Sequence, residues 1–288
     1  MRPRALAVAA STALVCAAAT LHAQQPGAAA ALSPGAHVAA LHHVRMYYEV
    51  QGQGRPLLLL HGGASTIQRS FGRQLEDFGR DHLIIAPEQR GHGHTRDVPG
   101  PYRYADMAGD TAELLDRLGV RDADVVGWSD GAILALILAV RRPDLVRRLV
   151  VSAANVDPGS RAITPESQAL IRDYRADDDT AARAEYQHLS GDSIGGYAAV
   201  IGKLKRLWLD HPTPDELTFA ELGRIRAPAL VMAGDRDAIR LDQTIAIYRA
   251  IPGAALFIVP DTGHPTFRDR PAWVDPVVRA FLEESPPR

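Results

Sequence analysis

The sequence predicts a doubly wound α/β domain, in which helices cover both faces of a mostly parallel sheet. Two observations carry this prediction. Short apolar runs recur after residue 40 and alternate with helix-like segments, as in successive strand–helix–strand units. In addition, the motif Gly-Trp-Ser-Asp-Gly at residues 127–131 lies between an apolar strand-like run and an apolar helix-like run. A sharp strand-to-helix turn is therefore expected at its centre.

The expected strands are of two kinds. Val44–Val50 alternates between apolar and polar residues and is followed by Gln-Gly-Gln-Gly, which favours an antiparallel hairpin edge. The later runs are continuously apolar, as are central strands of a parallel sheet that is buried on both faces. These runs are Pro56–Leu60, Leu83–Ala86, Ala123–Val126, Leu149–Ser152, Ala229–Ala233 and Ala255–Val259.

Two helices are predicted together with their ends. One has a mostly apolar face at helical spacing, and Gly119 is its natural stop. The residues of that face are Met107, Thr111, Leu114, Leu115 and Leu118. The other, Ala132–Arg142, is apolar nearly all round and ends before Pro143. We expect this second helix to be buried at the centre of the domain.

Residues from about 156 to 224 break the alternation, since they contain helix-favouring stretches and no convincing strand. The stretches are Pro165–Arg175, Thr180–Leu189 and Tyr197–Trp208. A helical excursion near the carboxyl ends of the strands would form a cap over a site there. The alternative is a structural insertion with no gating role.

The N-terminus resembles a secretory signal peptide at residues 1–23. Arg2 and Arg4 form a basic start, Ala5–Leu21 is small and apolar, and Ala23 ends a plausible cleavage site. Export to the periplasm or the medium is therefore expected. Cys16 suggests a lipoprotein as the alternative, but Val15 before it is bulkier than lipidation normally requires. Residues 24–40 follow as a flexible lead-in that is rich in Ala, Gly and Pro near its start.

Composition narrows the class of partner. The 288 residues are 46% hydrophobic and 23% charged, and 32 Lys and Arg face 34 Asp and Glu. This balance gives no electrostatic case for nucleic acid or an anionic membrane as the main partner. Cys16 is the single cysteine, and its removal with the signal peptide would exclude disulfides, thiolate metal sites and a cysteine nucleophile.

The motif at 127–131 has the form of a nucleophile elbow centred on Ser129. Gly127 and Gly131 would allow the backbone to fold tightly around the serine, although a plain turn serine is the alternative reading. A serine hydroxyl needs a base within hydrogen-bond reach, and the base needs an orienting acid.

Candidates for the acid and the base follow the last two predicted strands in the expected order. Asp237 follows the run that ends at 233, and His264 follows the run that ends at 259. Asp235 and Asp157 are alternative acids. His92 and His94 are the histidines that most resemble a metal-ligand pair, but no acidic or cysteine companion stands at metal spacing.

With these motifs the chain resembles the α/β-hydrolase family from about residue 41 to 288. The matching segments are His61-Gly62-Gly63, Arg90-Gly91-His92-Gly93, the elbow, Gly234-Asp235-Arg236-Asp237 and Gly263-His264. The elbow is similar to that of valacyclovir hydrolase-like esterases and related carboxylesterases. The chain departs from the family at Glu88-Gln89, where an Asp is common at 88, and at Pro265 and Thr266 after the histidine.

The resemblance implies an eight-stranded sheet with a helical cap, and a triad of Ser129 as nucleophile, Asp237 as acid and His264 as base. The oxyanion hole is expected from the backbone amides of Gly63 and Asp130. His61 is expected to brace its loop. No metal or organic cofactor is needed.

An exported serine hydrolase acting on carboxylic esters is the leading interpretation. The Asp130 carboxylate would suit the cationic group of an amino-acid ester, unless it faces water or an arginine. A cofactor-free haloperoxidase or perhydrolase would use the same triad, and a catalytically silent binding protein is the least favoured alternative. Dehalogenase and epoxide hydrolase readings are disfavoured because those relatives carry aspartate at the elbow.

Overall fold

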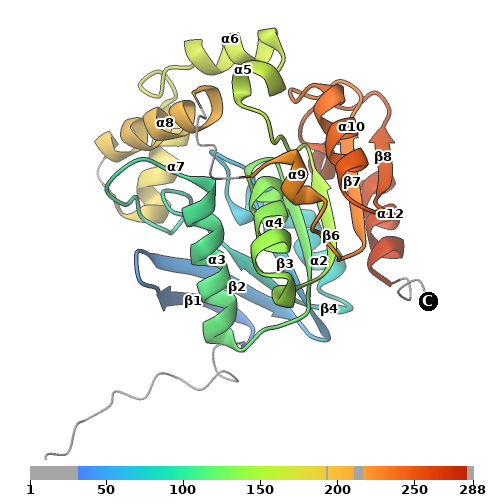
Figure 1. Cartoon of the computed structure of the whole chain (residues 1–288). Helices are drawn as coiled ribbons and strands as arrows, with labels where there is room; N and C mark the ends of the chain where they lie inside the picture. The colour runs from blue at the N-terminus through green and yellow to red at the C-terminus, as the bar shows by residue number, and fades with distance from the viewer. Residues whose placement is uncertain (1–31, 193, 211–216, 284–288) are drawn as a thin grey trace, which may run out of the picture.

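An eight-stranded, mostly parallel sheet forms the centre of the molecule (Figure 1). The computed structural model describes residues 32–192, 194–210 and 217–283, so the predicted signal peptide lies outside it. The strands run in the order β1-β2-β4-β3-β5-β6-β7-β8, and the pairs β1·β2 and β2·β4 are antiparallel. The predicted fold class is confirmed. The strands are β1 (Gly35–Ala40), β2 (Arg45–Gly52), β3 (Arg55–Leu60), β4 (His82–Pro87), β5 (Ala123–Trp128), β6 (Val146–Ser152), β7 (Ala229–Gly234) and β8 (Ala255–Val259).

Strand β1 corrects one prediction, because residues 35–40 belong to the sheet and not to a flexible lead-in. The strand pairs antiparallel with β2, and the His37 ring stacks on Tyr48 with centroids 5.1 Å apart. A tight turn in which Leu41 N–H donates to the Val44 carbonyl (2.9 Å) joins the two strands. As an edge strand with no fully buried residue, β1 lacks the apolar pattern that marks a strand in sequence.

The helices pack on both faces of the sheet because consecutive strand residues point to opposite sides. Along β3, Leu57 and Leu59 pack with α2 and α12, whereas Leu58 and Leu60 pack with α3 and α4. This two-sided burial explains the continuously apolar strands in the sequence. The helices outside the cap are α2 (Ile67–Phe78), α3 (Tyr104–Leu118), α4 (Asp130–Arg141), α10 (Leu241–Ala250), α11 (Thr266–Asp269) and α12 (Pro271–Glu283), with the 3-10 turn η1 (Pro143–Leu145).

Both helices whose ends were predicted are confirmed. Every residue of the predicted face of α3 is buried, and Gly119 ends the helix in the left-handed conformation with φ 67°. Helix α4 is buried at each position from Asp130 to Val140 and ends before Pro143. A central buried helix is therefore attached directly to the carboxyl end of β5.

The segment between β6 and β7 forms a helical cap at one end of the sheet (Figure 1). Its helices are α5 (Gly159–Ala162), α6 (Pro165–Asp173), α7 (Thr180–Ser190), α8 (Ile194–Leu209) and α9 (Phe219–Leu222). Helices α6, α7 and α8 correspond to the three predicted stretches. Polar contacts hold the cap on the core: the Lys203 ammonium of α8 lies 2.7 Å from the Asp97 carboxylate, and Arg96 Nε–H donates to the Ser190 carbonyl (3.0 Å).

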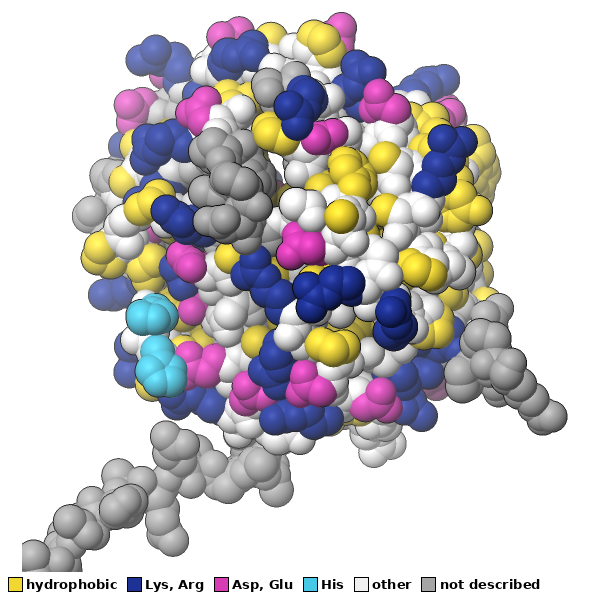
Figure 2. Space-filling view, in the orientation of Figure 1, with side chains coloured by type: hydrophobic (Ala, Val, Ile, Leu, Met, Phe, Trp, Pro, Cys, Tyr) yellow, Lys and Arg dark blue, Asp and Glu magenta, His cyan; other side chains and the backbone are white. Residues whose placement is uncertain are grey.

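The surface carries both signs of charge. On the face shown in Figure 2, basic and acidic side chains are interspersed, without an extended area of one sign. Many charged side chains of the described residues are paired across neighbouring elements, as in the contact of Arg142 with Asp116 at 2.8 Å. Within the described residues, no helix is both long and apolar enough to cross a bilayer.

Replacing Gly131 by alanine should destabilise the fold, because the new Cβ would lie 2.0 Å from the Leu60 carbonyl oxygen. Backbone atoms of a central strand cannot move aside without disturbing the sheet. We expect the free energy of unfolding, measured by urea denaturation, to fall by about 1–3 kcal/mol.

Gly109→Ala is the matched control, since Gly109 lies inside α3 and no atom lies within 4 Å of its added Cβ. Alanine favours a helix interior by roughly 0.5–1 kcal/mol, so this variant should gain stability. If both variants changed stability alike, the steric argument for Gly131 would be wrong.

Candidate active site

Ser129 lies at a turn that the backbone makes between β5 and α4. Its φ of 56° and ψ of −123° are uncommon for a residue with a side chain. The turn is held by Ser129 N–H, which donates to the Ser152 carbonyl of β6 (2.9 Å), and by Ala132 N–H, which donates to the Ser129 carbonyl (2.8 Å). The strained turn holds the serine side chain at the carboxyl end of the sheet.

The two glycines of the elbow are required by backbone contacts. A Cβ on Gly127 would lie 2.3 Å from the Gly131 carbonyl oxygen, and a Cβ on Gly131 would meet β3. Neither contact involves a flexible side chain, so neither can be relieved by a rotamer change. The elbow therefore brings β3, β5 and α4 to the closest approach that the backbone allows.

The structure brings together the three side chains of the predicted triad. His264 Nε2 lies 2.9 Å from Ser129 Oγ, and His264 Nδ1 lies 2.7 Å from Asp237 Oδ1. Since an ionised carboxylate can only accept, Nδ1 carries the proton and Nε2 is free to accept from the serine hydroxyl. The carboxyl of Asp237 is 1% exposed and the imidazole of His264 is 27% exposed, so the chain of hydrogen bonds leads from the interior to the cavity.

The loops after β7 and β8 place the acid and the histidine. Asp237 Oδ1 also accepts from Ile239 N–H (2.9 Å), which fixes the carboxylate. The main-chain oxygen of His264 accepts from Trp128 Nε1–H (2.8 Å), so the histidine loop is tied to the elbow itself. Gly234 lets the two loops meet, because a Cβ there would lie 2.0 Å from the Thr262 carbonyl oxygen.

The two alternative acids have other partners. Asp235 is exposed, and its carboxylate accepts from Thr262 N–H (3.0 Å), a bond that lowers the pKa of Asp235 and braces the histidine loop. Asp157 accepts from Gln243 Nε2–H (2.8 Å) and pairs with Arg161 at 2.8 Å. Asp237 is thus the carboxylate that faces His264.

The two residues expected to supply the oxyanion hole, Gly63 and Asp130, lie next to each other. Asp130 is the first residue of α4, so its N–H has no acceptor within the helix and lies at the positive end of the helix dipole. Gly63 follows β3, and a Cβ there would come within 2.2 Å of Asp130 Oδ2 and 2.6 Å of the Trp208 ring. A side chain at position 63 would therefore displace the groups around the serine.

A cavity of about 300 Å³ opens beside Ser129, between the core and the cap. Ser129, His264, Gly63 and Asp130 form its polar side. The rest of its wall is mostly apolar and comes from the elbow, the cap and the β7 loop: Tyr104, Trp128, Asn155, Ile163, Ser167, Leu170, Ile171, Leu207, Trp208, Ala238 and Ile239. A second cavity of about 340 Å³ shares Leu170, Ile171 and Trp208 with it, so the two cavities adjoin at these side chains.

The Asp130 side chain faces neither water nor an arginine, in contrast to one of the sequence interpretations. It is buried and accepts from Tyr104 Oη–H (2.8 Å) and from Trp208 Nε1–H (3.0 Å to Oδ2). Burial raises the pKa of this carboxyl, and the two hydrogen bonds lower it again in part. The sequence does not mark Tyr104 and Trp208 as site residues, because each belongs to an ordinary amphipathic helical pattern.

The remaining histidines of the neighbouring loops serve the protein's own backbone and side chains. His94 Nδ1 lies 2.9 Å from the buried Glu88 carboxylate, and the His94 ring stacks on Tyr47 with centroids 4.1 Å apart. His61 and His92 both contact main-chain groups. In the part of the chain that the structure describes, no three His, Cys, Asp or Glu side chains are grouped to hold a metal ion.

The chain is similar to known hydrolases over most of its length. The sequence profile of the alpha/beta hydrolase family matches residues 57–277. The chain is 26% identical to human "Serine hydrolase BPHL" over 260 residues, which cover 85% of this chain and 86% of that one. It is 28% identical to a 2-hydroxymuconate semialdehyde hydrolase of Pseudomonas putida over 254 residues, covering 82% and 89% of the two chains. Its fold is similar to that of the enol-lactonase from Burkholderia xenovorans LB400, with a TM-score of 0.68, 22% identity, and coverage of 86% of this chain and 100% of the other.

Asp237→Asn should reduce kcat far more than Asp235→Asn, although both remove one negative charge from the same loop. An amide at 237 would stabilise the wrong imidazole tautomer, an effect worth on the order of 10⁴-fold in kcat in the Ser-His-Asp template. Steady-state kinetics on an activated ester would measure both variants. A larger loss of kcat in Asp235→Asn than in Asp237→Asn would identify Asp235 as the catalytic acid.

Proposed function

The chain belongs to the alpha/beta hydrolase family and is a hydrolase, and we propose that it cleaves carboxylic esters through an acyl-enzyme on Ser129. One observation carries the proposal: the hydrogen-bonded series Ser129–His264–Asp237 ends in a mostly apolar cavity beside two backbone amides. This arrangement supplies a nucleophile, a base and donors for a developing oxyanion at a single place.

The reaction follows from the distances. Ser129 Oγ attacks the ester carbonyl carbon as its proton passes over 2.9 Å to His264 Nε2. Asp237, at 2.7 Å from Nδ1, stabilises the imidazolium. The negative carbonyl oxygen accepts from the amides of Gly63 and Asp130, each worth about 2.7–4 kcal/mol to the transition state.

Collapse of the tetrahedral intermediate completes the first half. His264 gives its proton to the alcohol oxygen as the C–O bond breaks, which leaves the acyl group on Ser129. Water then enters, loses a proton to His264 and attacks the acyl carbon, and a second collapse releases the acid and restores the serine.

The lining of the cavity favours a substrate with apolar groups. Apart from the catalytic groups and Asp130, its wall consists largely of aliphatic and aromatic side chains from both core and cap. Relatives include a "Pimeloyl-[acyl-carrier protein] methyl ester esterase" of Nitrosospira multiformis, 26% identical over 257 residues, which favours ester cleavage as the activity.

Export is part of the proposal and is supported by the N-terminal sequence alone. Arg2, Arg4 and the apolar run 5–21 have the pattern of a cleaved signal peptide. Mass spectrometry of the mature protein should find Gln24 at its N-terminus. An intact residue 1 in the soluble fraction of the cell would overturn export.

A panel of p-nitrophenyl esters should be hydrolysed by the wild-type protein, and Ser129→Ala should lose this activity by on the order of 10⁴-fold or more with little change in thermal stability. A fluorophosphonate probe should label the wild type at Ser129 and fail on the variant. Failure of the wild type to react with the probe would identify a silent binding protein.

The same panel distinguishes the remaining alternatives. Monochlorodimedone halogenation in acetate and peroxide that exceeded ester hydrolysis would favour a perhydrolase and contradict the proposal. Esters of α-amino acids, each paired with the analogue lacking the amino group, test whether Asp130 binds an ammonium. Equal kcat/KM within the pairs would show that the Asp130 carboxylate binds no ammonium group and only holds the cap through Trp208.

A further inference from the structure

Two buried histidines lie next to each other, close to the expected oxyanion hole. His61 belongs to the loop after β3 and His92 to the loop after β4, two strands that pair in parallel. The imidazoles are almost fully buried, and their centroids are 5.0 Å apart. Neither ring faces Ser129 as a proton carrier in the mechanism above.

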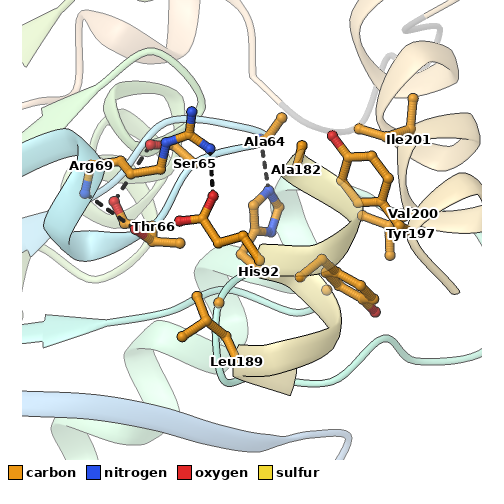
Figure 3. A pocket seen from close by; sticks show the side chains of 14 residues that line it. Ala64, Ser65, Thr66, Arg69, His92, Ala182, Leu189, Tyr197, Val200 and Ile201 are labelled. Carbon is orange, nitrogen blue, oxygen red and sulfur yellow. Dashed lines mark hydrogen bonds and ion pairs between the residues drawn. The ribbon is translucent and has the colours of Figure 1, made fainter. Parts of the chain in front are cut away.

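Each histidine accepts a hydrogen bond from the other histidine's loop. His61 Nε2 accepts from Gln89 N–H (2.9 Å), and His92 Nε2 accepts from Ala64 N–H (3.0 Å). Figure 3 shows the second bond, with His92 below Ala64 at the edge of a pocket walled by cap helices α7 and α8. The two loops are therefore clamped to each other in both directions.

The tautomers of both rings follow from these partners. A main-chain N–H can only donate, so both Nε2 atoms are unprotonated. The protons lie on Nδ1, where His61 donates to the Gly62 carbonyl (2.8 Å) and His92 donates to the Arg90 carbonyl (3.0 Å). Both imidazoles are thus neutral, with every ring nitrogen in use.

Two of these four bonds act on the two peptide groups that flank Gly63, and the other two hold the rings to the loop after β4. The Gly62 carbonyl and the Gly63 N–H belong to one planar trans peptide and point in opposite directions. Holding the carbonyl at His61 therefore directs the Gly63 N–H away from His61. The next peptide is held through Ala64 N–H at His92, and Ala64 has φ 50°, a conformation that needs support in a residue with a side chain.

We propose that His61 and His92 are positioning residues that keep the Gly63 N–H aimed at the oxyanion by preventing rotation of its two flanking peptides. The inference rests on the proposed function, since it assigns a purpose to the Gly63 amide in that reaction. Rotation of the 62–63 peptide would replace a donor by a carbonyl oxygen and would repel the developing negative charge.

Burial keeps the imidazoles of His61 and His92 neutral at ordinary pH. Burial, with a contribution from neighbouring His92, lowers the pKa of His61 to about 3. Burial also lowers the pKa of His92 to about 4, against the bonds to Arg90 and Gln89 and the charge of Asp97, which raise it. An unfolded chain protonates these histidines near pH 6.5, so the pair makes the fold progressively less stable as pH falls below that value.

The test compares substitutions that remove both hydrogen bonds of a ring with substitutions that restore the bond to the peptides beside Gly63. His61→Leu removes the donor to Gly62, and His61→Asn restores an N–H near Nδ1. His92→Leu removes the acceptor for Ala64, and His92→Gln restores an oxygen near Nε2. His188→Leu, at an exposed position of α7, is the control for replacing a histidine by leucine.

The leucine variants should lose kcat by about tenfold to 10³-fold, up to the loss of a full oxyanion donor, with KM nearly unchanged. Affinity for an alkylboronic acid, whose Ser129 adduct places an oxygen in the oxyanion hole, should fall in parallel with kcat/KM. The Asn and Gln variants should stay within about threefold of wild type, as should His188→Leu. If the two histidines only supported the fold, their loss would not lower kcat selectively over KM, and boronate affinity would not fall in parallel with kcat/KM.

Several results would overturn the inference. The first is that the leucine variants fold and keep the kcat and the boronate affinity of the wild type, while Ser129→Ala is inactive. The proposed function would then stand, but His61 and His92 would not position the Gly63 amide. If the leucine variants fail to fold, loss of activity in the folded Asn and Gln variants would equally contradict it. Absence of ester turnover and of boronate binding in the wild type would instead overturn the proposed function.

Discussion

The site depends on one steric constraint, the backbone contact among β3, β5 and α4 at the elbow. Gly127 and Gly131 allow this contact because a Cβ at either position would lie closer to a carbonyl oxygen than van der Waals contact permits. The resulting turn holds Ser129 at positive φ and starts α4 at the next residue. A nucleophile and a free helix N-terminal amide are thereby produced by the same few residues, in a fixed relation to each other.

The other groups of the site are tied to this turn by contacts with main-chain atoms. Trp128 Nε1–H donates to the His264 carbonyl, and Gly234 permits the loops after β7 and β8 to touch. The loop after β3 is held in turn by the loop after β4. Pre-organisation of this kind means that little reorganisation is needed when charge develops on a bound carbonyl.

Asp130 has two separate roles in the geometry. Its main chain offers an N–H at the start of α4, while its buried carboxylate accepts from Tyr104 of the core and Trp208 of the cap. The side chain thus anchors the cap helix α8 directly at the nucleophile. Because Trp208 also lines both cavities under the cap, the position of α8 affects the shape of the space that a substrate can occupy.

From the sequence alone one can derive the α/β class, most strands, the central buried helix and the order of serine, acid and histidine. These features are local: glycine spacing, apolar periodicity and the position of polar residues just after strands. Strand β1 could not be derived, because its stability comes from pairing with β2 and not from its own composition. Likewise, only the tertiary structure decided that Asp237 and not Asp235 faces His264, that Trp208 reaches Asp130, and that His61 and His92 clamp each other's loops. Each of these is a contact between segments distant in the chain, and its geometry is set by the packing of the sheet and cap as a whole.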